Sequence, residues 1–330
     1  IEGTFAEAVL LETLALSILN YDSAVATAAA RMTVAAGERP LAEMGSRRAS
    51  EEAAVAAARA AYIAGFSATS NLEAGRRWGV PTMGTAAHAW TLLHDTEEDA
   101  FRSQVEALGP GTTLLIDTYD IPEGVRTAVR VAGAELGGVR IDSGDLPIVA
   151  GEVRALLDEL GATNTRITVT SDLDEYALAA LAASPVDSYG VGTSVATGSG
   201  VPTAGLVFKL VAREAADGSW VGVAKASAQK ASHGGRKAAF RTLDAGTATS
   251  ELIIVSDGFE ELSTAAEHPD ARALQTALME DGEADAASLG AAGVQAARAH
   301  HSRVREELPV RALALSKADP ALPTEYRNAE

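Results

Sequence analysis

The order of hydrophobic and polar positions predicts short buried strands that alternate with longer helices through the middle of the chain. Runs of apolar, β-branched residues predict the strands, and the segments after them have apolar residues at helical spacing. Repeated strand–helix units of this length build a parallel sheet or a (β/α) barrel. The expected strands are 113–116, 139–141, 166–170 and 186–189, and the helices that follow the first three are 122–137, 146–160 and 175–183.

Segments with other patterns flank these units. Residues 4–36 predict one long helix with Thr4 and Glu7 as a capping box. This helix has few polar positions, so we expect it to be buried against other helices or a second subunit. The remaining predicted elements are helices at 51–64 and 269–305, strands at 80–83 and 249–255, and a hairpin of 206–213 with 220–224 that closes near Asp217-Gly218.

These changes along the chain predict three parts. We expect a helical remnant of another domain at 1–40, a (β/α) barrel catalytic domain at 41–240, and a C-terminal segment at 241–330 that packs on a flanking domain. The chain begins at Ile1 and enters a helical pattern almost at once, so we expect a preceding natural segment to be missing.

Polar side chains follow each expected strand. Arg140 lies in the strand 139–141, which leads into Asp142-Ser143-Gly144-Asp145. Charge at the tip of a buried strand is costly unless a ligand or partner is present, although a turn that caps the next helix through Asp142 or Ser143 is an alternative. The other strand ends carry Asp117, Ser171-Asp172, and Gly190-Val191-Gly192-Thr193.

The carboxyl ends of barrel strands form the active face, so we expect these residues to share one rim. Carboxylates there suit sugar hydroxyls or Mg²⁺, and the glycine turn suits a phosphate. His88 follows the small residues Gly84-Thr85-Ala86-Ala87, and an imidazole can act as a nucleophile near neutral pH. A plain hydrogen-bonding role for His88 is the alternative.

Basic residues gather in two stretches of an acidic chain. The net charge is −18, yet seven basic residues lie between Lys209 and Arg241, among them Lys225 and Lys230. Arg47 and Arg48 adjoin Gly45 and Ser46. Such clusters are typical of sites for phosphate or another small anion, and a solvated surface hairpin is the alternative for the longer stretch.

Composition narrows the class of protein. A net charge of −18 argues against a nucleic-acid partner. The chain has no Cys, which excludes disulfides and thiolate chemistry and fits a reducing compartment, so we expect a cytoplasmic protein. We expect no signal peptide and no membrane-spanning helix.

Seven motifs together resemble the nicotinate phosphoribosyltransferases of NAD salvage, which are type II phosphoribosyltransferases. The resemblance implies an irregular (β/α) barrel with a flanking α+β domain. It also implies condensation of nicotinate with phosphoribosyl pyrophosphate to nicotinate mononucleotide and pyrophosphate, coupled to ATP hydrolysis, with Mg²⁺, by a homodimer with shared active sites. The motifs are Glu43-Met-Gly-Ser-Arg-Arg48, Gly84-Thr-Ala-Ala-His88, Asp117-Thr-Tyr-Asp120, Gly138-Val-Arg-Ile-Asp-Ser-Gly-Asp145, Ser171-Asp172, Tyr189-Gly-Val-Gly-Thr193 and Lys225-x-Ser-x-x-Lys230.

The same resemblance implies a role for each motif. ATP would phosphorylate His88, with Asp117 and Asp142 as further catalytic residues, and Arg140 would hold the pyridine carboxylate or ring. The implied contacts to the other substrate groups are Asp142, Asp172, Ser143 and Ser171 for ribose and its surroundings, Gly190, Gly192 and Thr193 for the 5′-phosphate, and Arg47, Lys225 and Lys230 for pyrophosphate or phosphate.

Other functions stay open at this point. Nicotinamide phosphoribosyltransferase is the nearest alternative, and we prefer nicotinate because the Gly-Thr-Ala-Ala-His motif and the Arg47-Arg48 pair look more like that branch. Quinolinate phosphoribosyltransferase needs no ATP and gives no reason for His88. The family's preceding N-terminal segment is not in the sequence, and His233-Gly234 replaces a Pro-Gly element, so an inactive fragment or a non-catalytic phosphate-binding barrel is the alternative of another class.

Overall fold

The computed structural model describes residues 1–225, 232–256 and 270–328. These residues form two compact units, one α/β and the other mainly β. The α/β unit comprises Ile18–Ala204 and Gly290–Arg298, and the second unit comprises Ile1–Ser17, Gly205–Leu289 and Ala299–Glu330. The domain boundaries predicted at residues 40 and 240 stay a prediction, because compactness by itself does not define a domain.

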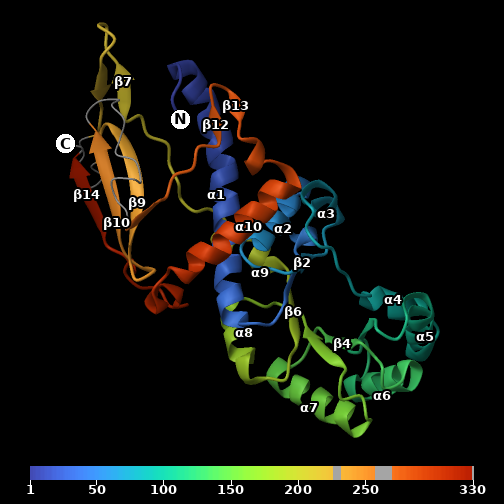
Figure 1. Cartoon of the computed structure of the whole chain (residues 1–330). Coiled ribbons are helices and arrows are strands. Elements are labelled where there is room, and N and C mark those ends of the chain that lie inside the picture. Colours follow the sequence, from blue (N-terminus) through green and yellow to red (C-terminus); the bar gives the residue numbers. More distant parts are fainter. Residues whose placement is uncertain (226–231, 257–269, 329–330) are drawn as a thin grey trace. The chain divides into compact units, whose positions relative to one another are not determined.

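A six-stranded parallel sheet forms the centre of the α/β unit, with the strand order β2-β1-β6-β5-β4-β3 (Figure 1). A single bridge from Thr69 to Thr82 continues it beyond β2, where the sequence predicts a full strand. The four strands predicted from the βα pattern are confirmed within a few residues. The strands are β1 (Leu41–Glu43), β2 (Ala68–Thr69), β3 (Thr113–Leu115), β4 (Gly138–Ile141), β5 (Arg166–Val169) and β6 (Ser188–Val191).

The two faces of this sheet differ in polarity. Val139, Ile141, Ile167 and Val169 are fully buried and pack in one core with apolar residues of the surrounding helices. The residues that alternate with them are small or polar, and Arg140 and Thr168 are examples. The helices of the unit are α2 (Glu51–Ile63), α3 (Leu72–Trp78), α4 (His88–Leu93), α5 (Glu97–Leu108), α6 (Ile121–Ala132), α7 (Leu146–Glu159), α8 (Glu175–Ala180) and α9 (Thr193–Ala196), with 3₁₀ turns η1 (Ser46–Arg48) and η2 (Leu181–Ala183).

The long helix α1 (Phe5–Ala36) begins at the predicted capping box. The backbone N–H of Thr4 donates to Glu7 at 2.9 Å, and Glu7 N–H donates to Thr4 Oγ1 at 3.4 Å. Within this chain only the residues from Ala24 onward include buried side chains, so the first half is not buried against other helices of the described chain, and its burial against a second subunit stays a prediction. Phe5 and Leu10 are 74% and 78% exposed.

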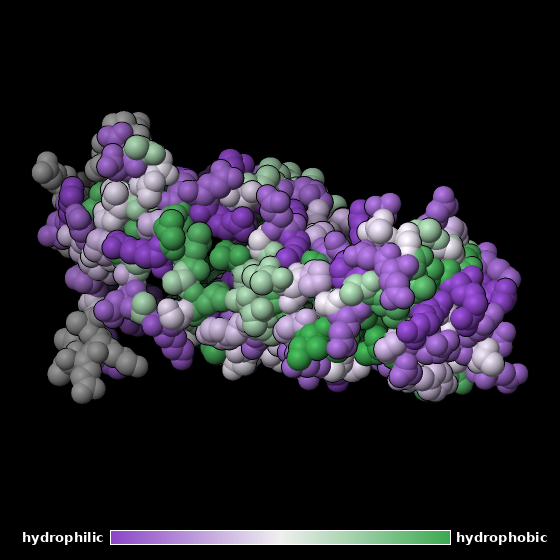
Figure 2. Space-filling model, turned by 90° about the horizontal axis from the view of Figure 1, so that it is seen from below, coloured by the Kyte–Doolittle hydropathy of each residue, from purple (hydrophilic) through white to green (hydrophobic). Residues whose placement is uncertain are grey.

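The second half of α1 is buried because Val25, Met32 and neighbouring alanines join the core of the α/β unit. Hydrophobic residues are visible among hydrophilic ones on the face drawn in Figure 2. Helix α1 is long and apolar enough to cross a membrane, but core helices of soluble proteins can have the same length and hydropathy. The sequence analysis expects no membrane-spanning helix, and the length and hydropathy of α1 do not support that expectation.

The second unit contains a four-stranded sheet with the order β11-β9-β10-β14. Its core is Phe240, Leu252 and Ile254. The strand predicted at 249–255 is confirmed as β10, and the predicted hairpin is confirmed as β7 with β8, although its first strand covers only Ala212–Glu214 rather than 206–213. The elements are β7 (Ala212–Glu214), β8 (Trp220–Gly222), β9 (Arg236–Asp244), β10 (Thr247–Ser256), β11 (Ala271–Ala273), β12 (Met279–Glu280), β13 (Glu283–Ala284), β14 (Thr324–Asn328), α10 (Gly290–Glu306), which continues from the α/β unit, and the 3₁₀ turns η4 (Ala286–Ser288) and η5 (Val310–Leu313).

The helix predicted at 269–305 is wrong for its first part. Residues 271–284 contain β11 and the β12–β13 hairpin, and α10 begins only at Gly290. Asp281 and Gly282 close this hairpin with φ values of 50° and 82°. An Asp-Gly pair with two positive φ angles is a strong turn signal, and the Glu/Ala-rich composition around it concealed that signal.

Candidate active site

His88 and Asp117 meet at the carboxyl edge of the parallel sheet. His88 is the first residue of α4, and Asp117 lies two residues after β3. The His88 Nε2 atom lies 3.1 Å from Asp117 Oδ1, with the imidazole 40% exposed and the carboxylate 0% exposed. Since a carboxylate accepts but does not donate, this contact assigns a proton to Nε2, and in the neutral form of the ring the lone pair is then on Nδ1. Within the described part of the chain the ring has no second hydrogen-bond partner.

The other oxygen of Asp117 binds the turn that follows β4. Asp117 Oδ2 accepts hydrogen bonds from the backbone N–H of Asp142 and from Ser143 Oγ, both at 2.8 Å. One buried carboxylate therefore joins His88 to the Asp142–Asp145 turn. The alternative that Asp142 or Ser143 caps α7 is wrong, because the N-cap of α7 is Asp145, which makes no side-chain capping bond within the described residues.

Arg140 connects β4 to two other segments. Its Nε donates to Thr170 Oγ1 at 2.9 Å, and its Nη2 donates to Asp142 Oδ1 at 3.1 Å. On the other side, its Nη1 donates to Thr85 Oγ1 at 2.8 Å and to the Ala86 carbonyl at 3.4 Å. The guanidinium side chain is 13% exposed, so these acceptors replace most of its water. The structure thus brings His88, Asp117, Arg140, Asp142 and Ser143 together, as the sequence predicts.

Gly190, in β6, and Gly192, directly after it, pack closely against Met44, the residue that follows β1. A Cβ atom on Gly190 would lie 2.7 Å from both Met44 Sδ and Thr170 Cγ2. On Gly192 it would lie 3.2 Å from the Met44 carbonyl oxygen. Close packing therefore explains why glycine occupies these two positions, independently of any ligand. Thr193 begins α9 directly after Gly192.

A buried acid supports the segment that carries Arg47. Glu43 is buried, and its carboxylate accepts from Thr69 Oγ1 and from the backbone N–H of Gly45. Burial raises the pKa of Glu43 above its usual range, against the lowering effect of these two donors. Arg47 follows in η1 with an exposed side chain, so it is available to a ligand.

The turn after β5 has a strained backbone. Ser171 has φ of 106°, a left-handed value that residues with a side chain rarely adopt. Such strain costs about 1–3 kcal/mol and clusters at functional sites. Asp172 follows with an exposed side chain.

Two acidic residues near the strand ends have structural roles. Asp120 caps α6 by accepting from the backbone N–H of Glu123, and Asp174 caps α8 by accepting from Tyr176 and Ala177. Asp117, Asp142 and Asp172 have no such capping bond and stay candidates for chemistry, as does the exposed Asp145, which makes no side-chain capping bond within the described residues.

Lys225 and Lys230 belong to the segment of the second unit that the sequence analysis singles out. The backbone N–H of Lys225 donates to Ser232 Oγ at 3.1 Å, and its side chain is exposed. Lys230 lies outside the described residues. The roles predicted for both lysines stay predictions.

Sequence reasoning missed Glu97, at the start of α5. Burial, followed by the charges of Glu123, Asp120 and Asp117, raises its pKa from 4.5 to about 7. Its Oε1 atom is buried and has no hydrogen-bond partner in the described structure. No sequence motif marks Glu97, because its environment comes from α6 and the turn after β3.

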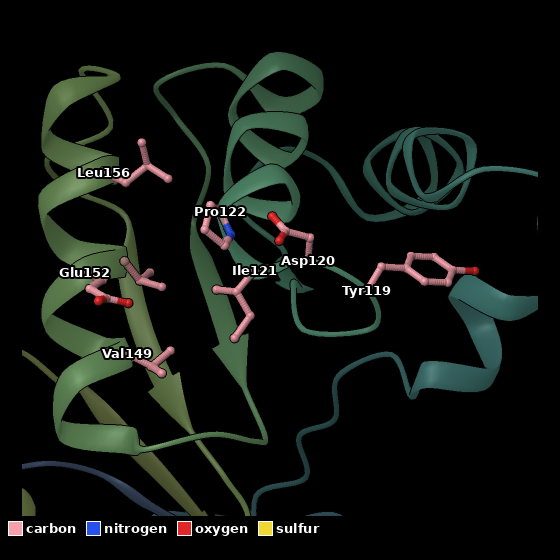
Figure 3. A pocket seen from close by; sticks show the side chains of 8 residues that line it. Tyr119, Asp120, Ile121, Pro122, Val149, Glu152 and Leu156 are labelled. Atoms are coloured by element: carbon pink, nitrogen blue, oxygen red, sulfur yellow. The ribbon is translucent and has the colours of Figure 1, made fainter.

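Two cavities lie in the α/β unit. One of about 290 Å³ lies between the start of α6 and α7, and Figure 3 shows Ile121, Val149 and Glu152 from the two sides of it. The other, of about 520 Å³, lies near the amino ends of the strands and is lined by Thr113, Arg166 and Thr168 among others. Neither is lined by a described residue that the sequence predicts for the site. The described residues also contain no group of three or more His, Cys, Asp or Glu side chains suited to hold a metal ion.

Curated relatives of this chain share one name. No family model matches the sequence. The chain is 63% identical over 262 residues to nicotinate phosphoribosyltransferase pncB1 of Mycobacterium tuberculosis, an alignment that covers 77% of this chain and 57% of that protein. It is 41% identical over 263 residues to nicotinate phosphoribosyltransferase of Bacillus subtilis, covering 76% of this chain and 53% of that protein. The chain thus spans a little over half the length of these relatives.

Solved structures agree on the fold. Human nicotinic acid phosphoribosyltransferase matches with a TM-score of 0.69 at 25% identity, covering 94% of this chain and 72% of that one. Nicotinate-nucleotide pyrophosphorylase from Pyrococcus furiosus matches with a TM-score of 0.74 at 22% identity, covering 90% and 73%, and shows the fold. This chain belongs to the nicotinate phosphoribosyltransferase family, and its fold is the α/β, irregular (β/α) barrel class of the type II phosphoribosyltransferases with a flanking α+β part.

Proposed function

We propose that the protein carrying this chain condenses nicotinate with phosphoribosyl pyrophosphate to give nicotinate mononucleotide and pyrophosphate, in NAD salvage. The observation that carries the proposal is the buried carboxylate of Asp117, which joins His88 to the Asp142 backbone at the carboxyl edge of one sheet, while Arg140 binds the Asp142 side chain. The names of relatives at 63% and 41% identity support the same pair of substrates.

Ribosyl transfer develops positive charge on the sugar, because the bond to pyrophosphate breaks as the pyridine nitrogen attacks the anomeric carbon. Asp142 and Asp172 are the carboxylates proposed to face the ribose and stabilise that charge, with Ser143 and Ser171 beside them. Gly190, Gly192 and Thr193 would bind the 5′-phosphate.

The leaving pyrophosphate needs cations. Arg47, Lys225 and Lys230 are proposed to bind it, and Mg²⁺ would neutralise its oxygens. Mg²⁺ commonly enters such sites on substrate phosphates rather than in an all-protein cage. That mode fits this chain, since no described cluster of three or more His, Cys, Asp or Glu side chains is suited to a metal.

ATP coupling is proposed to proceed through His88. The Nδ1 lone pair attacks the γ-phosphorus of ATP, the bond to the bridging oxygen breaks, and ADP leaves. Asp117 holds the opposite nitrogen, Nε2, and stabilises the positive charge on the phosphorylated ring. Water later cleaves the nitrogen–phosphorus bond, releasing phosphate and restoring the imidazole. The phosphorylated state would favour the tight-binding form of the enzyme.

We also propose a cytoplasmic homodimer with shared active sites. The exposed apolar side chains in the first half of α1, such as Phe5 and Leu10, support a protein partner there. The absence of Cys supports a reducing compartment, and the net charge of −18 supports neither nucleic acid nor an acidic membrane surface as a partner.

The test is product formation from nicotinate and phosphoribosyl pyrophosphate, with and without ATP. Nicotinamide and quinolinate are tested in parallel, and a preference for either would replace the proposal by that rival. Labelled ATP should leave an acid-labile, base-stable phosphate on the wild type. The label should be lost in His88→Ala and kept in His300→Ala, an exposed histidine on α10. A folded protein without product and without label would support an inactive phosphate-binding barrel.

A further inference from the structure

The hydrogen bonds of Arg140 point to two segments with different roles. Nε and Nη2 bind Thr170 and Asp142, the residues that directly follow β5 and β4 at the edge of the sheet. Nη1 binds Thr85 and the carbonyl of Ala86, which lie in the loop immediately before His88. This loop lies between the bridge at Thr82 and α4, so Arg140 connects the strand edge to the segment that sets where α4 and His88 begin.

Thr170 fixes the sheet side of this connection. It is buried, and its hydroxyl accepts from Arg140 Nε while it donates to Asp142 Oδ1. A hydroxyl can do both, because it has one proton and two lone pairs. Arg140 and Asp142 are thereby held in one orientation on β4 and the turn after it. Thr85 is the corresponding acceptor on the loop side.

We propose that Arg140 couples the base site to His88, with Thr85 and Thr170 as positioning residues. The inference rests on the proposed function, in which Arg140 meets the pyridine carboxylate and His88 is phosphorylated. A carboxylate that binds the outer edge of the guanidinium takes the remaining N–H of Nη2 and one N–H of Nη1. The Nη1 bonds to Thr85 and Ala86 then realign, and in this proposal the loop carries the change to His88. By linkage, a change at His88 alters the affinity of the base site by the same factor.

The test measures nicotinate binding by calorimetry, with and without ATP, in the purified protein. The quantity compared is the factor by which ATP changes the nicotinate dissociation constant. Allosteric couplings commonly amount to about 5–150-fold. We expect Thr85→Val and Thr170→Val to reduce the wild-type factor toward one, and Thr85→Ser and Thr170→Ser to keep most of it, because serine retains the hydroxyl.

Thr168→Val is the matched control. Thr168 lies on the same strand face as Thr170, and its hydroxyl pairs with Ser188 at 2.8 Å. We expect this variant to keep the wild-type factor. Thermal unfolding of every variant separates loss of coupling from loss of fold, and if one valine variant fails to fold, the other reaches Arg140 from the opposite side.

The outcomes distinguish the inference from the function beneath it. Valine variants that keep both the wild-type factor and the phosphate label would overturn the coupling and leave the proposed function standing. A folded wild type that neither makes product nor responds to ATP would overturn both. If the valine and serine variants reduced the ATP-dependent change in nicotinate affinity equally, the hydroxyl groups of Thr85 and Thr170 would not carry the coupling, and the inference would be wrong.

Discussion

The carboxylate of Asp117 is fully buried, yet it lies 3.1 Å from the half-exposed imidazole of His88. Its second oxygen is occupied by the backbone N–H of Asp142 and by Ser143. Asp117 therefore orients both the imidazole and the Asp142–Asp145 turn. Because it is shielded from solvent, its charge acts on His88 more strongly than an exposed carboxylate would.

Replacing Asp117 tests this arrangement. In Asp117→Asn the side chain has about the same shape but no charge, so the phosphorylated imidazole loses its stabilising partner. We expect phosphate transfer from ATP to His88 to slow by about 10²–10⁴-fold, the range for a positioned acid–base partner. Rapid-quench measurement of labelled protein gives this rate.

Asp120→Asn is the control for that experiment. Asp120 lies in the same turn but caps α6. Asn is also a good N-cap, so both stability and the labelling rate should stay close to wild type. An Asp117→Asn protein that is labelled as fast as the wild type would contradict the assigned role.

The contact between Gly190 and Met44 predicts a stability effect. In Gly190→Ala the new Cβ would lie 2.7 Å from Met44 Sδ and from Thr170 Cγ2, so neighbouring groups must move. We expect a loss of about 1–3 kcal/mol in the free energy of unfolding. Urea denaturation measures it.

Gly151 provides a matched substitution in α7. A Cβ there would meet no described atom within 4 Å. Alanine is a better helix former than glycine, so Gly151→Ala should raise stability by about 0.5–1 kcal/mol. Equal effects of the two substitutions would show that the close approach at Gly190 has no energetic consequence.

Glu97 predicts a pH dependence of stability. Its pKa is raised from 4.5 to about 7 in the folded protein, mainly by burial, so the folded state binds this proton more tightly than the unfolded state. The stabilising contribution of protonated Glu97 to the free energy of unfolding is therefore fully present below pH 4.5 and is lost as the pH rises through about 7. Glu97→Gln should remove this loss and make the thermal midpoint less dependent on pH across that window.

The exposed Glu106→Gln on the same helix is the control for Glu97. Thermal midpoints at a series of pH values compare the two variants with the wild type. The assigned environment of Glu97 would be wrong if its substitution left the slope unchanged, or if both substitutions changed it equally.

The exposed half of α1 predicts an effect on assembly. Leu10 and Leu14 are 78% and 58% exposed, so charged substitutions there should not disturb the core of a subunit. We expect Leu10→Glu with Leu14→Glu to weaken the proposed dimer, which sedimentation velocity at several concentrations measures. Leu72→Glu, at an exposed position of α3, should leave the dimer intact. Recovery of the wild type with membranes rather than as a soluble dimer would contradict the proposal.

The parts of the fold that the sequence predicts are the ones with local signals. Val139 and Ile141 mark a buried strand by residue type, and Thr4 with Glu7 marks a helix start by spacing. The short strand β11 depends instead on β9, about 30 residues earlier in the sequence, and the local β12–β13 hairpin lies in a helix-like composition that concealed its turn. The first half of α1 shows a different limit of sequence-based prediction. An apolar pattern indicates that a helix face needs a partner, but it does not say whether the same chain supplies that partner.

The candidate site follows the same division. The polar strand ends could be predicted to share a rim, since parallel strands end at one edge of the sheet. The pairing of His88 with Asp117 could not, because the two are 29 residues apart and a loop and two helices lie between them. Thr85 lies in the Gly84–His88 motif and Thr170 ends a predicted strand, but no sequence signal marks their contacts with Arg140, which the fold creates.

The burial of Asp117 has a consequence for regiochemistry. The nitrogen that it holds is the τ nitrogen of the imidazole, so we expect the phosphoryl group proposed for His88 to form the π isomer. We also expect the ring to keep its contact with Asp117 while the group is transferred and released. In the nuclear magnetic resonance spectrum of the phosphorylated protein, we expect a single phosphoimidazole resonance with the coupling pattern of the π isomer, because Asp117 holds the other nitrogen.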